Sequence, residues 1–213
     1  MKSSRRLMTL AFVVLLLLAL VPAGCVTLNT SPSSVANTTT PSVSPAGMET
    51  YQNTSLGVKF SYPREWETKV FNDSQAGTYY AVRPYFDSML GCQMQFYALK
   101  NPYVSSNKSD AALNHVNQGI AAFKKRSETN NAYFSNFKLI QGPTRITLAD
   151  EPAWKFTASY TFPLDAERSE RDGIWIWTTH GNNLYGIAYS GPPQDYNRHL
   201  GTAQQIIDSF EFI

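Results

Sequence analysis

The sequence of residues 154–162 is Trp-Lys-Phe-Thr-Ala-Ser-Tyr-Thr-Phe, in which apolar and polar side chains alternate without a break. Successive side chains of a β-strand point to opposite faces of a sheet, so this stretch predicts a strand with one apolar and one polar face. Residues 174–177, Ile-Trp-Ile-Trp, are instead apolar at every position. That pattern predicts a strand covered on both faces. Both stretches indicate a β-sheet with other elements packed against it.

Further patterns along the chain predict the remaining elements. Short apolar or alternating stretches bounded by turn residues predict strands at residues 58–62, 68–71, 78–82, 91–100, 137–148, 172–179 and 184–189. One helix is expected after Ser109 or Asp110 and another after Asp195, because each residue is a good N-cap ahead of apolar side chains at helical spacing. The sequence therefore predicts an α+β fold, with an antiparallel β-sheet flanked by helices.

The start of the chain has the order of an export signal. Lys2, Arg5 and Arg6 are basic, residues 7–21 form an apolar run, and two small residues precede Cys25. The run is shorter than the roughly 20 residues that a membrane-spanning helix needs. A cysteine directly after small residues resembles the lipobox of bacterial and archaeal lipoproteins, in which the thiol is lipidated and becomes the new N-terminus. We therefore expect a lipid anchor at Cys25 and a protein on the outer face of the cytoplasmic membrane.

Two alternatives to this processing remain. Pro22 stands at the position where lipoprotein signals usually have Leu, Val or Ile. An uncleaved signal would still tether the protein to the membrane, whereas cleavage without lipidation would release it. All three outcomes place the rest of the chain outside the cytoplasm.

Composition divides the chain into three parts. Residues 1–24 are expected to be a signal peptide of the lipoprotein type. Residues 25–50 are the lipidated cysteine followed by a stretch rich in Ser, Thr and Pro, which cannot bury enough apolar surface to repay its ordering and so predicts a disordered stalk. Residues 51–213 hold nearly all of the aromatic side chains and have the length of a single domain.

Asn-x-Ser/Thr sequons mark candidate glycosylation sites and predict surface positions. They occur at Asn29, Asn37, Asn53, Asn72 and Asn107.

Charge excludes one class of partner. Lys2, Arg5 and Arg6 are three of the 18 basic residues, so the rest of the chain has 15 basic and 16 acidic side chains and a formal net charge of −1. Without a basic patch, nucleic-acid binding is not expected. We also expect no metal or cofactor, because His115, His180 and His199 have no second ligand at a metal-binding spacing.

Cys92 would have no disulfide partner if Cys25 carries lipid, since the chain has only two cysteines. In a strand, Cys92 would share a face with Met94, Phe96 and Ala98. We therefore expect Cys92 to be a small buried apolar side chain.

Two stretches resemble known sequences of the PsbP-like family, named for an extrinsic subunit of photosystem II. The first, near the start of the domain, consists of Tyr51 and the run Gly-Val-Lys-Phe-Ser-Tyr-Pro-Arg-Glu-Trp at 57–66. The second, near its end, consists of Leu-Tyr-Gly-Ile-Ala-Tyr at 184–189, residues 196–200, and Ile-Ile-Asp-Ser-Phe at 206–210. The resemblance implies an α/β/α sandwich around an antiparallel sheet that acts by binding a partner. It transfers no functional residue and does not imply photosynthesis.

Two stretches are candidates for a partner surface. Trp175 and Trp177 lie in the strand that is apolar on both faces; burial in the core is favoured for them, and the alternative is that one face forms part of a partner groove. Residues 165–172 carry charges of both signs between two strands, which predicts an exposed hairpin loop. Its candidate contact residues are Glu167, Arg168 and Arg171.

The sequence therefore favours a membrane-tethered, non-catalytic binding or accessory module for an envelope protein or a small ligand. The alternative is an envelope hydrolase or ligand-processing enzyme whose site is assembled from dispersed residues, such as His180, Asp172 and Ser190. A cleft with convergent titratable groups would favour the enzyme, and a flat apolar patch would favour the binding module.

Overall fold

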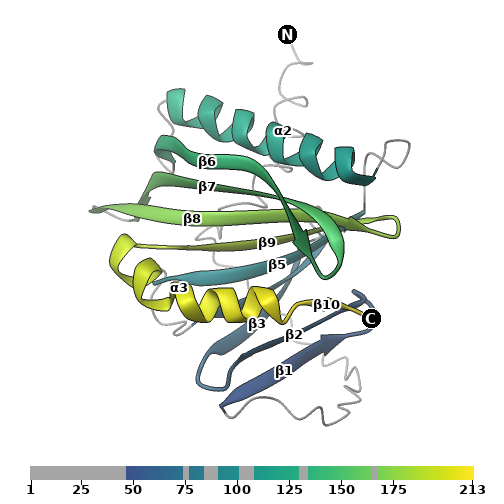
Figure 1. The fold of residues 1–213 in the computed structure, drawn as a ribbon. Coiled ribbons are helices and arrows are strands. Elements are labelled where there is room, and N and C mark those ends of the chain that lie inside the picture. Colours follow the sequence, from purple (N-terminus) through teal and green to yellow (C-terminus); the bar gives the residue numbers. More distant parts are fainter. Residues whose placement is uncertain (1–46, 74–76, 84–90, 101–107, 130–133, 165–166) are drawn as a thin grey trace.

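The computed structural model describes residues 47–73, 77–83, 91–100, 108–129, 134–164 and 167–213 (Figure 1). The predicted signal peptide, Cys25, and the sequons at Asn29, Asn37 and Asn107 lie outside these residues.

The described strands form two antiparallel sheets. The large sheet has the order β3-β4-β5-β9-β8-β7-β6. Its strands are β3 (Glu67–Asp73), β4 (Gly77–Arg83), β5 (Gln93–Lys100), β6 (Ser135–Leu148), β7 (Glu151–Leu164), β8 (Glu167–His180) and β9 (Asn183–Gly191). The small sheet has the order β1-β2-β10, with β1 (Met48–Asn53), β2 (Val58–Pro63) and β10 (Glu211–Phe212).

Two helices cover opposite faces of the large sheet in the described part of the chain (Figure 1). Helix α2 (Lys108–Glu128) packs on β6, β7 and β8, whereas α3 (Pro193–Asp208) packs on β8, β9 and β2. The small sheet lies on the side of α3, since Val58 and Phe60 of β2 share a core with Ile206 and Ile207 of α3. The predicted α+β class and the α/β/α sandwich are confirmed.

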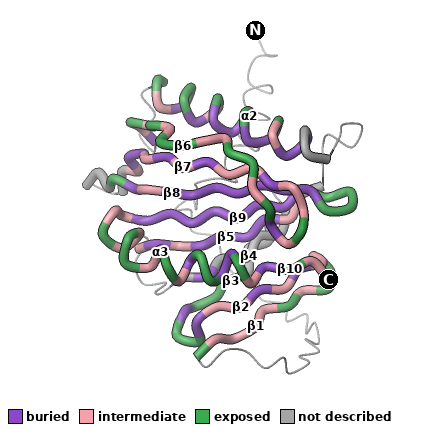
Figure 2. The backbone as a smooth tube through the Cα atoms, in the orientation of Figure 1, coloured by how far each residue is buried: buried purple, intermediate pink, exposed green. Residues whose placement is uncertain are grey.

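Strand β8 is buried on both faces, as its sequence predicts. Ile174 and Ile176 point into the core under α3, and Trp175 and Trp177 point into the core under α2. Figure 2 shows that most residues of β8 and β9, at the centre of the sheet, are buried. Both tryptophans are 1% exposed, so the prediction that one face of this strand serves as a partner surface is wrong. Helix α2 covers that face because its own apolar stripe, which includes Val116 and Phe123, needs the same burial.

Two glycines make room for the indole rings of β8. A Cβ atom on Gly173 would lie 2.4 Å from the ring of Trp175, and one on Gly186 would lie 2.6 Å from the ring of Trp177. Gly186 is also the direct cross-strand partner of Trp177 in β9. Each indole ring therefore occupies the space that a side chain at the neighbouring glycine would fill.

Ser209 and Phe210, directly after α3, connect this helix to the small sheet. Ser209 Oγ accepts a hydrogen bond from the Ser61 amide at 2.8 Å and lies 2.8 Å from the Ile206 carbonyl oxygen. The next residue, Phe210, stacks on Phe96, which stacks in turn on Phe60 of β2 with ring centres 3.8 Å apart. These contacts give a structural role to both the Ser-Phe stretch and the opening strand of the domain.

Strand β6 forms one edge of the large sheet, and irregularities interrupt its pairing with β7. Gly142 has a φ of +106°, and a Cβ there would lie 2.6 Å from the Lys155 carbonyl oxygen, so only glycine fits this bulge. Ile140, just before it, is 64% exposed. The edge strand is thereby bent and its regular pairing pattern broken.

Several expected boundaries differ from the structure. Strand β1 begins at Met48, so three residues assigned to the stalk belong to the small sheet. Helix α2 begins at Lys108, ahead of both expected caps. The N-cap of α3 is Pro192, and Asp195 lies within its first turn. Proline tolerates the first helical position because its missing N–H would have no partner there, so Pro193 can start the helix earlier than Asp195.

A substitution at Gly186 tests the indole packing. We expect Gly186→Ala to lower the free energy of unfolding by about 1–3 kcal/mol, because the added methyl group displaces the Trp177 ring. Gly201→Ala is the matched control, since nothing lies within 4 Å of that Cβ position and alanine is the better helix former. Urea unfolding should show destabilisation at position 186 and none at position 201; equal effects would contradict the packing account.

His115 provides a pH test of the α2–sheet interface. It is buried against Trp177, with ring centres 4.2 Å apart, and burial lowers its pKa from 6.5 to about 4. Between these values the unfolded chain binds a proton that the folded chain does not, so stability falls as the pH falls. We expect a loss of about 2 kcal/mol between pH 7 and pH 5, absent in His115→Leu. Urea unfolding at both pH values measures it; an unchanged pH dependence in the variant would contradict the assignment.

Candidate binding surface

The face of β7 that points away from α2 is polar and partly open. Phe156, Ala158 and Tyr160 point into the core under α2, while Lys155, Thr157 and Ser159 on the opposite face are of intermediate exposure. Helix α3 packs beside this face, on β8 and β9. The alternating sequence of β7 thus gives the sheet a core side and a solvent side at this strand.

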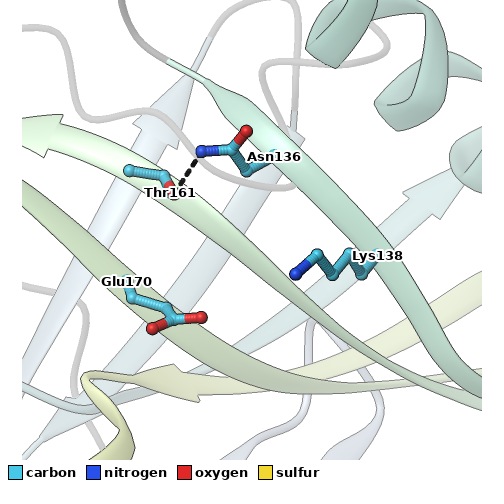
Figure 3. A pocket seen from close by; sticks show the side chains of 4 residues that line it. All are labelled: Asn136, Lys138, Thr161 and Glu170. Atoms are coloured by element: carbon cyan, nitrogen blue, oxygen red, sulfur yellow. Dashed lines mark hydrogen bonds between the residues drawn. The ribbon is translucent and has the colours of Figure 1, made fainter.

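A shallow pocket of about 440 Å³ lies on this face, and its wall comes from three adjacent strands (Figure 3). Asn136 and Lys138 come from β6, Thr161 from β7 and Glu170 from β8. Thr161 is opposite Glu170 in the pairing of β7 with β8, and Lys138 is opposite Ser159, which in turn is opposite Asp172. The register therefore places a cation on one side of β7 and two carboxylates on the other.

Thr161 carries the most deeply buried polar group of the pocket. It is 8% exposed, and its Oγ1 accepts a hydrogen bond from Asn136 Nδ2 at 3.2 Å. Asn136 has a φ of 54°, a left-handed conformation that asparagine adopts more readily than most residues. Thr161 Oγ1 is the acceptor in this bond, so its own O–H remains available to donate to a ligand. The amide oxygen Oδ1 of Asn136 remains available to accept.

The charged side chains of the pocket do not neutralise one another directly. Among the described residues, neither Lys138 nor Glu170 forms an ion pair within 4.0 Å. Figure 3 shows the two side chains reaching towards each other from opposite sides of β7. Burial, together with the negative charge of Glu170, raises the pKa of Asp172 above its ordinary value. The β8 side of the pocket is therefore a site where negative charge is poorly compensated.

A second, smaller pocket of about 220 Å³ lies further along the same face, between α3 and strands β6 to β8. Its apolar wall includes Ile146, Ile174, Ile176 and Ile207, and its polar groups include Lys155, Gln204 and Asp208. Gln204 and Asp208 are already joined by a 2.7 Å hydrogen bond. The open face of β7 thus runs from a polar pocket at Thr161 to a mixed one at Lys155.

The predicted charged loop at residues 165–172 is not a loop over most of its length. Strands β7 and β8 pair as far as Leu164 with Glu167, so residues 167–172 belong to β8. Arg171 is 3% exposed and donates a hydrogen bond to the Gly91 carbonyl oxygen at 2.7 Å, which excludes it from an exposed partner surface. Glu167 and Arg168 lie in β8, and their side chains are outside the described part of the structure.

The dispersed residues considered for a hydrolase do not come together. Asp172 and His180 are eight residues apart on one strand, which is about 26 Å. His180 Nδ1 lies 2.8 Å from Glu151 Oε1, and its ring stacks on Phe212. Ser190 is opposite Gly173 in β9, and its neighbour Tyr189 points with Ile174 into the α3 core, so Ser190 points to the other face from Asp172.

Three other positions considered in the sequence analysis, Asn53, Asn72 and Cys92, lie among the described residues. The side-chain amide of Asn53 donates to Tyr51 Oη at 2.9 Å and accepts from the Leu56 amide at 3.0 Å. Asn72 lies in β3, opposite Thr78, because this strand extends beyond the predicted stretch 68–71. Cys92 is a free thiol that is 2% exposed, and burial raises its pKa, so its expected role as a small core side chain is confirmed.

The described residues contain no group of three or more His, Cys, Asp or Glu side chains arranged to hold a metal ion. None of the helices in the described ranges has the length and apolar character needed to cross a membrane.

Sequence reasoning missed the pocket residues because they come from three strands. The register in which those strands pair cannot be inferred from the sequence of any one of them. One signal was present: Thr161 is a polar position of the alternating 154–162 stretch, so its side chain belongs to the polar face of that strand. Lys138 and Glu170 join it only through the register of β6 and β8.

Comparison with known proteins identifies the family. A family model described as "PsbP-like protein" matches residues 8–212, so the chain belongs to the PsbP-like protein family. No match was found among curated proteins.

One solved structure has the same fold, and two others show more distant similarity. The solution structure of cyanobacterial PsbP (CyanoP) from Synechocystis sp. PCC 6803 is 13% identical, covers 82% of this chain and 98% of its own, and superposes with a TM-score of 0.53. LpqN from Mycobacterium tuberculosis, described as involved in cell envelope biogenesis, is 9% identical over 72% of this chain and 82% of its own, with a TM-score of 0.43. The Saccharomyces cerevisiae Ran-binding protein Mog1p is 10% identical over 78% and 95%, with a TM-score of 0.42.

Proposed function

We propose that the protein is a lipid-anchored binding module on the outer face of the cytoplasmic membrane, and that it binds an envelope partner or small ligand on the open face of β7. The observation that carries the proposal is the polar pocket formed by Asn136, Lys138, Thr161 and Glu170. A PsbP-like fold is compatible with a non-catalytic binding role.

Sequence supports the anchor. The basic start, the apolar run and the small residues before Cys25 are the features that export and lipidation require. One lipid chain gives only marginal anchoring, so a diacylated Cys25 is the form that would hold the protein stably. The Ser-, Thr- and Pro-rich composition of residues 26–46 supports a spacer, whose span at random-coil dimensions would be about 25 Å.

The pocket supports binding over hydrolysis. Its groups are a cation, a carboxylate, a hydroxyl and an amide, which are suited to hold a polar ligand in one orientation. The residues considered for nucleophile, base and acid lie on opposite faces or far apart, and His180 is already bound by Glu151. The pocket therefore supports the binding role, whereas the dispersed residues of the hydrolase alternative do not converge on one site.

Capture from crosslinked native membranes tests both parts of the proposal with the full-length protein. The wild-type chain should fractionate with membranes, and its N-terminal peptide should begin at a diacylated Cys25 by mass spectrometry. Cys25→Ser should lack that lipid. From the membrane fraction, wild-type protein should recover a discrete crosslinked partner, and Lys138→Glu should reduce its recovery by reversing a charge in the pocket.

Lys124→Glu is the matched control, since Lys124 is exposed on α2, on the opposite side of the sheet, and the charge change is the same. Recovery that falls equally in both variants would contradict a role for the open face. A wild-type N-terminus without lipid would contradict the anchor.

A further inference from the structure

The opposite charges of the polar pocket are held apart by the sheet itself. Lys138 is on β6 and Glu170 is on β8, so one strand separates them and their backbones are about 10 Å apart. Neither has an ion-pair partner among the described residues, although the two side chains reach into one pocket (Figure 3). The space between them is lined by the hydroxyl of Thr161 and the amide of Asn136.

The acidic side of this pocket favours a positively charged group. Asp172 lies on the same face of β8 as Glu170, two residues along, because alternate residues share a face. Burial and the charge of Glu170 both raise the pKa of Asp172, so an ammonium group placed there would relieve repulsion between two carboxylates.

The basic side of the pocket favours an acceptor with negative charge. The Lys138 ammonium offers three donors, and the nearly buried Thr161 O–H offers another, since its oxygen already accepts from Asn136. A carboxylate would satisfy both kinds of donor with charge-assisted hydrogen bonds. No described side chain supplies such a group to Lys138.

Size limits the ligand. A volume of about 440 Å³ is in the lower part of the range of small-molecule pockets. The two ends of an extended dipeptide are roughly 6 Å apart, less than the 10 Å or so between β6 and β8, so both charged side chains can reach them. A direct Lys138–Glu170 ion pair would compete weakly, because exposed pairs contribute only about 0–1 kcal/mol.

We propose that this pocket binds a small zwitterion with separated ends, of which a free dipeptide is the simplest, with its ammonium at Glu170 and Asp172 and its carboxylate at Lys138. This inference rests on the proposed function and specifies the ligand class of the same site.

Blocked peptides test the inference without relying on a variant that might unfold. Full-length protein in detergent is titrated by calorimetry with alanylalanine, with its N-acetyl derivative and with its C-terminal amide. We expect saturable binding of alanylalanine and binding weaker by about fivefold or more for each blocked peptide, because each loses one charge-assisted contact.

Variants then assign each end of the ligand. Lys138→Gln should weaken alanylalanine by about fivefold and leave binding of the amide derivative unchanged, since that peptide has no carboxylate to lose. Glu170→Gln should weaken alanylalanine and leave the N-acetyl derivative unchanged. Lys124→Gln on α2 should alter none of the three.

Absence of saturable alanylalanine binding, equal binding of all three peptides, or loss of both blocked derivatives in one variant would overturn the zwitterion assignment. These failures are distinguishable from failure of the proposed function. If Lys138→Glu still reduces capture of a membrane partner while dipeptides do not bind, the open face is a binding surface and only the ligand class is wrong.

Discussion

The packing of two tryptophans against two glycines holds the centre of this fold together. Trp175 and Trp177 lie on one face of β8, and their rings occupy the space over Gly173 and Gly186, where any side chain would collide with them. Helix α2 covers the rings, and Ile174 and Ile176 on the other face pack beneath α3. One strand therefore joins both cores, which makes the three-layer arrangement a single packing unit. Buried aromatic area of this size dominates the energetics of a small core.

That same arrangement determines which surface is left for binding. Helix α3 packs on β8 and β9 and on β2 of the small sheet, while α2 packs on the opposite side over β6 to β8. The side of β7 that faces away from α2 consequently needs no apolar residues, and Lys155, Thr157 and Ser159 occupy it. The pocket at Thr161 and the smaller one near Lys155 both lie on this side. The proposed binding surface around Thr161 thus lies on the side of the sheet where α3 lines only the smaller pocket near Lys155.

Sequence periodicity predicted the layers better than it predicted the site. The alternation at 154–162 and the apolar stretch at 174–177 correctly separated a half-covered strand from a fully covered one. They did not reveal which helix covers which face of 174–177, because that depends on tertiary packing. Strand β1 was missed since its residues are mostly polar and it is held by pairing with β2. The charged stretch before residue 172 resembled a loop by composition, but cross-strand pairing with β7 extends β8 through it. Lys138, Thr161 and Glu170 meet only through register, which no local pattern contains.

The central proposal, that the open face of β7 is the binding surface, is tested most directly by hydroxyl-radical footprinting of the full-length protein in native envelopes and after purification. Lys138 lines the pocket and is exposed, Ile140 is exposed two residues further along β6, and Lys124 is exposed on α2 across the sheet. The account predicts that oxidation of Ile140 and Lys138 is suppressed in envelopes relative to purified protein, while oxidation of Lys124 is the same in both. Protection confined to α2, with Ile140 and Lys138 oxidised equally in both preparations, would contradict it.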